Sequence, residues 1–138
     1  MATFKLEIVT PEGRSFKDDV DYVLLPGSEG EFGVYAQHMP LMTQIKVGEL
    51  EIKKGNETFL LAVGEGFVEV VNDRVSVLTD MAFRADQIDE AKAEEARKRA
   101  EAALQHKLSA EEVAATTAAL ERSLAQLRVK RRHRDRRG

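Results

Sequence analysis

The sequence contains no cysteine and no tryptophan, and only 6% of its residues are aromatic. The absence of cysteine excludes a disulfide framework, a thiolate zinc site and a thiol nucleophile. With so few aromatic side chains, a stacking surface for single-stranded nucleic acid is not expected. The longest apolar run covers residues 59–63, whereas a membrane-spanning helix needs about 20 residues. The first residues lack the apolar core of a signal peptide and the arginine-rich helix of a transit peptide, so we expect a soluble protein that works where it is made.

Charge is unevenly distributed along the chain. The 138 residues carry a formal net charge of −3. Residues 128–138 carry +6, which leaves −9 for the rest of the chain. A basic end of this kind is usually a solvated terminus or an arm that binds an acidic partner.

The first part of the sequence has the pattern of short β-strands. Phe4, Leu6 and Ile8 alternate with the polar Lys5 and Glu7, so one face of this strand is expected to be buried. Further strands are expected between turn signals, at residues 20–25, 32–35, 41–46, 49–53, 58–63, 67–71 and 74–79. The spacing predicts an antiparallel β-sandwich, or flattened barrel. No helical segment interrupts these strands, so a parallel βαβ sheet is not expected.

The composition changes between residues 83 and 86, where we place a domain boundary. Residues 1–85 form the predicted sandwich, and residues 86–138 contain no proline and no glycine before the last residue. The second part predicts an antiparallel two-helix hairpin, which makes the fold class α+β. Asp86 is the expected N-cap of the first helix, which should run to about His106, with Asp89 favouring the helix start. Ser109 and Glu112 have the spacing of a capping box for the second helix.

The two predicted helices share a weak seam. The second helix offers a coiled-coil seam at spacings of 4, 3, 4 and 3, namely Val113, Thr117, Leu120, Leu124 and Leu127. The first helix faces them with mostly small residues, namely Ala93, Ala96, Ala100 and Leu104. Burial contributes about 0.8 kcal/mol per CH₂ group, so an alanine face stabilises the pairing little. Helices that persist while their docking opens are suited to act as a switch.

The sequence offers little catalytic chemistry. The histidines at 38, 106 and 133 are far apart, and no metal-binding or nucleophile motif is present. The glycine-rich segment 27–33 lacks the Lys-Ser/Thr pair of a phosphate loop, so we interpret it as turns between strands. His38 is either a surface residue or a partner contact, in a loop that Glu31 and Pro40 bracket. Two alternatives remain: a module that binds nucleic acid through its basic end, with salt-dependent affinity, or a nucleotide sensor that acts alone.

Three stretches resemble the epsilon subunit of bacterial F-type ATP synthase. Residues 30–41 resemble the family pattern G-x-x-G-[IV]-x-x-x-H-x-P-[LM], and residues 62–70 resemble its GGFVEV strand. Residues 88–93 resemble its [IL]DxxRA motif at the start of the first helix. Their order along the chain, the domain break and the total length also agree with the family.

The resemblance implies a non-catalytic subunit of the central rotor stalk, on the cytoplasmic side of a bacterial inner membrane. Its sandwich would bind the gamma subunit and the ring of c-subunits, with Glu31 and His38 on a loop that faces the ring. Its helices would extend towards the catalytic alpha and beta subunits and inhibit ATP hydrolysis. The basic residues implied to meet an acidic segment of a beta subunit are Arg122, Arg128, Lys130, Arg131 and Arg132. Membrane association would come only through the complex, and no nucleic acid would bind.

Some members of the family bind ATP on the folded hairpin. The positions that carry over are Ile88, Asp89, Lys92, Ala93, Arg99 and Arg122. Lys92 stands where the motif has an arginine and lacks the planar guanidinium. Gln126 stands where ATP-binding members often have a further arginine. We therefore expect regulatory ATP binding to be weak or absent, with no other cofactor and no metal.

Overall fold

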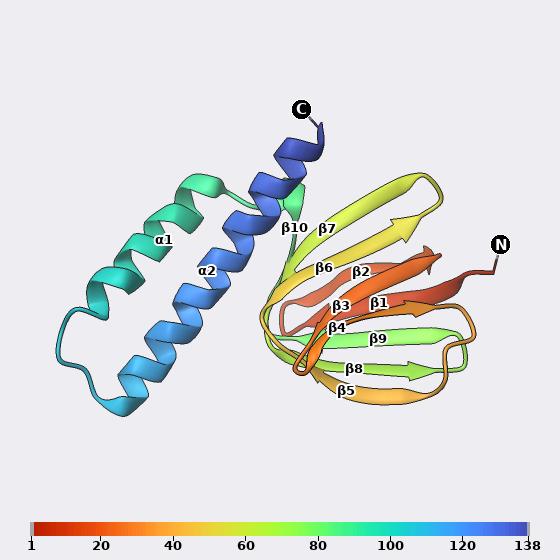
Figure 1. Cartoon of the computed structure of the whole chain (residues 1–138), viewed down its shortest axis with the longest axis horizontal. Helices are drawn as coiled ribbons and strands as arrows, with labels where there is room; N and C mark the ends of the chain where they lie inside the picture. Colours follow the sequence, from red (N-terminus) through yellow and green to blue (C-terminus); the bar gives the residue numbers. More distant parts are fainter. Residues whose placement is uncertain (1, 138) are drawn as a thin grey trace.

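An antiparallel arrangement of short strands builds the first part of the chain (Figure 1). The structure is a computed structural model that describes residues 2–137. Its strands are β1 (Phe4–Thr10), β2 (Gly13–Val20), β3 (Tyr22–Gly27), β4 (Gly30–Tyr35), β5 (Leu41–Ile45), β6 (Gly48–Lys54), β7 (Glu57–Val63), β8 (Gly66–Val71), β9 (Arg74–Thr79) and β10 (Ala82–Arg84). A 3₁₀ helix, η1 (Ala85–Gln87), and two α-helices, α1 (Glu90–Ala103) and α2 (Ala110–Arg137), follow.

The strands form one sheet that curves around a single core. Their order is β10-β7-β6-β3-β5-β8-β9-β1-β2, with β4 paired to β3. Strands from distant places in this order pack together, as β2 does with β6 and β1 with β10, which gives a near-closed sandwich. The predicted sandwich is confirmed. One pair, β1 with β9, is parallel, and it needs no βαβ crossover because most of the sandwich lies between these strands in the chain.

The core of the sandwich follows the period-2 pattern. Phe4, Leu6 and Ile8 are buried, whereas Lys5 is exposed and Glu7 is half-buried, as the alternation predicts. Strand β2 was not expected from the sequence, because its segment GRSFKDDV is largely charged and buries only Phe16 and Val20. It forms because β1 supplies its backbone hydrogen-bond partners. Strand β10 was also missed, since three residues are too few to show a period.

The start of the first helix differs from the expectation. Asp86 lies inside η1 and caps nothing in α1; the N-cap is Asp89, whose carboxylate accepts a hydrogen bond from the Lys92 backbone N–H at 3.1 Å. The reason is Ile88, which is extended and buried, so helical geometry can begin only after it. The helix also ends at Ala103, before His106.

The predicted capping box of the second helix is confirmed. The Ser109 hydroxyl accepts a hydrogen bond from the Glu112 N–H at 3.1 Å, and the Glu112 carboxylate accepts one from the Ser109 N–H at 3.0 Å. Helix α2 then continues through the basic end of the chain to Arg137. The basic end of the chain is therefore helical, and Arg128, Arg131 and Arg134 on it are exposed, as expected for a solvated terminus. That this end also binds an acidic partner protein stays a prediction. Neither described helix is both long and apolar enough to cross a membrane.

Helix α2 lies between α1 and the sandwich (Figure 1). On its sandwich side, Ala125 and Val129 join a second core, completed by Leu60, Ala62, Met81, Ala85 and Ile88. On the α1 side, the small residues Ala93 and Ala100 are buried, as predicted. The predicted seam of α2 is wrong at two positions, because Val113 is 42% and Leu124 37% exposed. A helix with two neighbours buries two stripes, and a heptad pattern with one seam describes only one of them.

Candidate functional site

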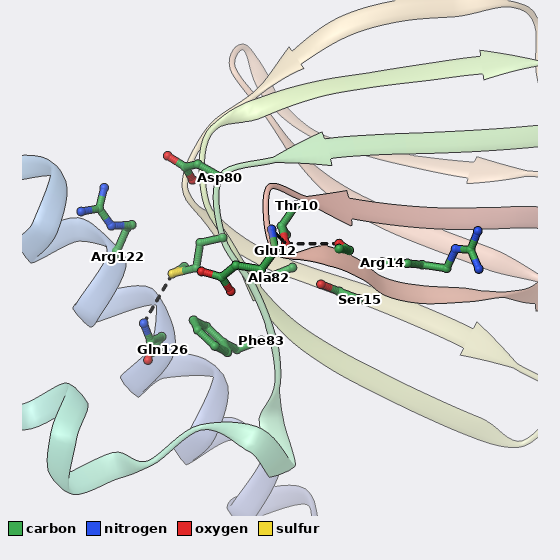
Figure 2. Close-up of a pocket in the computed structure, with 11 residues that line it drawn as sticks. Thr10, Glu12, Arg14, Ser15, Asp80, Ala82, Phe83, Arg122 and Gln126 are labelled. Carbon is green, nitrogen blue, oxygen red and sulfur yellow. Dashed lines mark hydrogen bonds between the residues drawn. The ribbon is translucent and has the colours of Figure 1, made fainter.

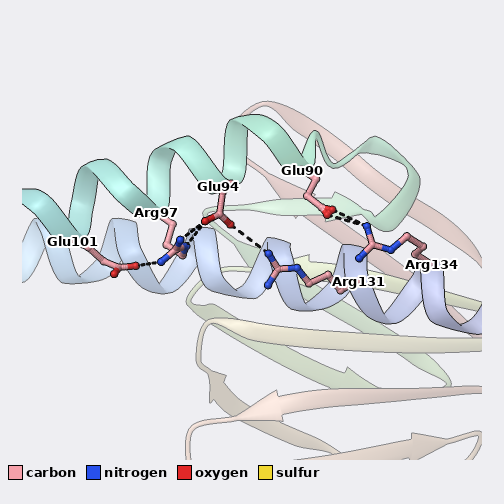
Figure 3. A network of polar contacts seen from close by, with 6 residues as sticks. All are labelled: Glu90, Glu94, Arg97, Glu101, Arg131 and Arg134. Atoms are coloured by element: carbon pink, nitrogen blue, oxygen red, sulfur yellow. Dashed lines mark hydrogen bonds and ion pairs between the residues drawn. The ribbon is translucent and has the colours of Figure 1, made fainter.

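The outer edge of the helical hairpin is held by charged side chains (Figure 3). Arg134 of α2 donates two hydrogen bonds to the Glu90 carboxylate of α1, at 2.9 and 3.1 Å. Arg131 lies 3.3 Å from Glu94, and Arg97 bridges Glu94 and Glu101 along α1. The hydrogen bond from Arg97 lowers the pKa of the Glu94 carboxyl below its usual range and raises the pKa of Arg97. This edge is exposed, so each pair contributes little by itself.

The opposite side of the same basic segment contacts the sandwich. Arg132 forms ion pairs with Glu49 and Glu51 of β6, and Arg136 donates a hydrogen bond to Glu51 at 2.8 Å. Lys130 donates one to the backbone carbonyl of Ala85 at 3.1 Å. Three residues predicted to act in inhibition, Lys130, Arg131 and Arg132, are therefore engaged within the chain when the hairpin is docked, whereas the predicted Arg128 is exposed.

A cavity of about 550 Å³ lies where α2 crosses the end of the sandwich (Figure 2). Arg122 and Gln126 border it from α2, and the Gln126 amide lies 3.4 Å from the Met81 sulfur. The β1–β2 turn and the segment before β10 border the other side, with the charged residues Glu12, Arg14 and Asp80. With two cations and two carboxylates in its lining, the cavity has no excess of one charge.

The structure does not gather the predicted ATP-binding residues around one cavity. Ile88 and Ala93 are buried in the packing of η1 and α1, and the Asp89 carboxylate is used as a helix cap. Lys92 and Arg99 are exposed and lie two turns apart on one edge of α1. The predicted Arg122 lines the cavity of Figure 2, which none of the other five borders. ATP binding therefore stays a prediction.

The residues expected to face the membrane ring occupy different elements. Glu31 lies in β4 opposite Pro26, so the expectation that Glu31 and Pro40 bracket one loop is wrong: residues 31–35 pair with β3, and only residues 36–40 are outside a strand. His38 follows the other end of β4, and its Nδ1 lies 2.7 Å from the Met39 carbonyl oxygen. The Gln37 N–H donates to the Asp73 carboxylate at 2.9 Å, which joins this loop to the β8–β9 turn.

An apolar surface on the outside of the sheet was missed by the sequence analysis. Met42, Phe67 and Leu78, here called the outer-sheet surface, are 67%, 52% and 55% exposed. Phe67 and Leu78 are direct partners across β8 and β9. The signal was present, because all three occupy outward positions of the period-2 pattern, where polar residues are expected. A group of exposed apolar side chains is typical of a surface that contacts a protein or a membrane.

These features define a class of protein: a β-sandwich with a docked helical hairpin that acts by binding other proteins. Within residues 2–137, no three metal-ligating side chains gather at one place. The family model of the ATP synthase delta/epsilon chain β-sandwich domain matches residues 3–85, and that of the delta/epsilon chain long α-helix domain matches residues 86–131. The chain belongs to the ATP synthase epsilon chain family, as its sequence resemblance indicates.

Relatives of known identity extend the match over nearly the full length. The ATP synthase epsilon chain of Dehalococcoides mccartyi is 47% identical over 97% of this chain and 96% of its own length. The ATP synthase epsilon chain of Desulforamulus reducens is 43% identical over 92% of this chain and 96% of its own length. The chain is accordingly a non-catalytic central-stalk subunit of an F-type ATP synthase.

Two solved structures share the fold. A chain in the Euglena gracilis mitochondrial ATP synthase, in a structure of OSCP, F1 and the c-ring, aligns with a TM-score of 0.76 and 26% identity. The alignment covers 88% of this chain and 77% of that chain. A chain from the central stalk and c-ring of the Tetrahymena thermophila mitochondrial ATP synthase aligns with a TM-score of 0.61, over 91% of this chain and 95% of that chain. At 12% sequence identity, this likeness shows a shared fold alone.

Proposed function

We propose that the chain couples rotation of the c-ring to the catalytic head and restrains ATP hydrolysis through its C-terminal helices. The observation that carries the proposal is the mode of docking of α2. Its basic end is held by ion pairs, and α2 contributes only Ala125 and Val129 to the apolar cluster that it shares with the sandwich. Contacts of this kind hold the helix in place and release it at moderate cost.

The outer-sheet surface is the proposed binding site for the gamma subunit. A subunit that stays bound through rotation needs an apolar contact, and these outward side chains supply one. The c-ring is proposed to contact β4, which pairs within the described residues only with β3 and therefore offers an open edge. Glu31 at one end of β4 and His38 beyond the other end are the proposed contacts.

The extended helices are proposed to reach the alpha and beta subunits. There Arg122, Arg128, Lys130, Arg131 and Arg132 would meet an acidic segment of a beta subunit. Their density of positive charge supports this role, because residues 128–138 carry +6. Residues 1–85 would then be the coupling unit and residues 86–138 the regulatory unit.

We place the complex at the cytoplasmic side of a bacterial inner membrane, with this chain held there by its partner proteins. ATP is proposed to bind weakly or not at all. Equilibrium dialysis of ATP against the full chain and a Lys92→Arg, Gln126→Arg double variant tests this. Tighter binding by the double variant is expected, because guanidinium groups contact phosphate oxygens in pairs.

The main test is ATP hydrolysis by the catalytic head with gamma. The full chain is compared with a version that ends after Ala85, and gamma binding by both is measured as the control for folding. We expect both to bind gamma and only the full chain to inhibit. Equal hydrolysis with both bound would refute the regulatory role, and failure of both to bind gamma would refute the coupling role. Salt-dependent RNA or DNA binding would then favour the nucleic-acid alternative.

A further inference from the structure

Glu51 is a buried carboxylate that depends on the far end of the chain. It lies on β6 and is only 8% exposed. Two arginines of α2 reach it, Arg136 at 2.8 Å and Arg132 at 3.3 Å. These arginines are four residues apart and so share one face of the helix. The partners are separated by more than eighty residues in sequence, so only the docked position of α2 brings them together.

The neighbouring Glu49 completes an acidic pair on the same side of β6. Residues two apart in a strand point to the same face, and Glu49 pairs with Arg132. Leu50 and Ile52 point the other way and are fully buried in the sandwich core. The face that carries Glu49 and Glu51 is covered by α2, and a buried carboxylate is tolerated only when a cation or hydrogen bonds compensate it.

We propose that Glu49 and Glu51 form an intramolecular docking site for the basic end of α2, here called the acidic docking site. It holds Arg132 and Arg136 in the docked state and competes for the basic segment with the acidic partner of the extended helices. The two sites compete because Arg132 pairs with Glu49 and Glu51 in the docked state and is the proposed contact of a beta subunit in the extended state. One side chain cannot make both contacts at once. This part rests on the proposed function.

The ionic character of the contact makes release possible. When α2 leaves, both arginines and both carboxylates regain hydration, whereas an apolar contact of equal area would leave a hydrophobic surface in water. An acidic partner can therefore exchange with the acidic docking site at small net cost. Loss of Glu51 would weaken docking and leave every arginine of the inhibitory set unchanged.

The absence of cysteine from the sequence allows a direct test on the full-length chain. Spin labels on cysteines introduced at the exposed Glu57 of β7 and Asp135 of α2 report the distance between sandwich and helix. Glu51→Gln is compared with Glu95→Gln, the same change at an exposed residue of α1 that forms no ion pair with the side chains of residues 2–136. We expect Glu51→Gln to raise the undocked population about tenfold and Glu95→Gln to leave it unchanged.

Arg136→Gln removes the contact from the helix side and guards against a folding defect caused by Glu51→Gln. Both variants should raise the undocked population. If the distances of both match the unchanged chain, the acidic docking site is refuted.

A parallel assay of ATP hydrolysis separates this proposal from the proposed function. We expect Glu51→Gln to inhibit the head at a lower concentration than the unchanged chain. A shifted distance without inhibition by any version would support the docking site and refute the regulatory function. If the unchanged chain inhibits and neither Glu51→Gln nor Arg136→Gln shifts the distance, the regulatory function is supported and the acidic docking site is refuted.

Discussion

The Asp89 carboxylate accepts a hydrogen bond from the backbone N–H of Lys92 at 3.1 Å and is the N-cap of α1. The family resemblance implies a second role for the same residue, in binding a nucleotide. Both roles would draw on the same carboxylate, whose Oδ1 makes the cap. A nucleotide that bound Asp89 through its carboxylate would have to share or displace the cap. A nucleotide site that included Asp89 would therefore be linked to the folded hairpin through one side chain, which gives the position a testable structural role.

Replacing Asp89 by alanine should destabilise the start of α1. Loss of an N-cap costs about 1 kcal/mol, and Asp89→Asn should lose much less because asparagine also caps helices. Amide hydrogen exchange in the first turn of α1 is the measurement, with faster exchange expected for Asp89→Ala. Equal exchange in both variants would show that the hydrogen bond does not hold the helix start.

Ala100 is 7% exposed in the contact between the two helices, and a larger side chain should force them apart. We expect Ala100→Leu to cost about 1–3 kcal/mol of hairpin stability, since overpacking displaces neighbours that cannot move freely. Ala91→Leu makes the same change at an exposed position of α1 and serves as the control. Urea denaturation of both variants tests the prediction, and equal midpoints would contradict the close packing.

The pKa of Glu94 should lie below that of an ordinary glutamate, because Arg97 hydrogen-bonds to its charged form. A pKa lowered on folding stabilises the folded state above the unfolded pKa, and this contribution disappears as pH falls through the folded value. Carbon-13 NMR titration of the Glu94 carboxyl is the measurement. Arg97→Gln should return the titration towards the usual range; an unchanged midpoint in this variant would rule out Arg97 as the cause.

Phe67 should be a principal contact for gamma if the outer-sheet surface is the binding site. Replacement of a central aromatic side chain in an interface costs about 2 kcal/mol or more, so Phe67→Ser should weaken binding roughly thirtyfold. Val113→Ser changes an apolar residue that is 42% exposed on α2 and should leave binding unaffected. Surface plasmon resonance on immobilised gamma gives both affinities, and equal losses in the two variants would place the interface elsewhere.

The local elements were largely predictable because their signals lie within a few residues. The alternation of apolar and polar residues predicted which side chains of β1 are buried. The spacing of Ser109 and Glu112 predicted where α2 begins. Strand β2 was not predictable from its own residues, because pairing with β1 rather than its composition stabilises it. Asp86 was preferred over Asp89 as a cap because nothing in the local sequence reveals that Ile88 is drawn into the second core.

The sequence by itself determined the two-part organisation, the order of most strands and the family, since periodicity, turns, caps and motifs depend on near neighbours in the chain. Only the tertiary structure decided what the arginines of the basic end contact. Its arginines can lie in water, bind a partner or meet Glu51, and sequence spacing does not distinguish these outcomes. Packing of α2 on the sandwich selects the last, because the helix that covers Glu51 and removes its water also brings Arg132 and Arg136 to compensate its charge.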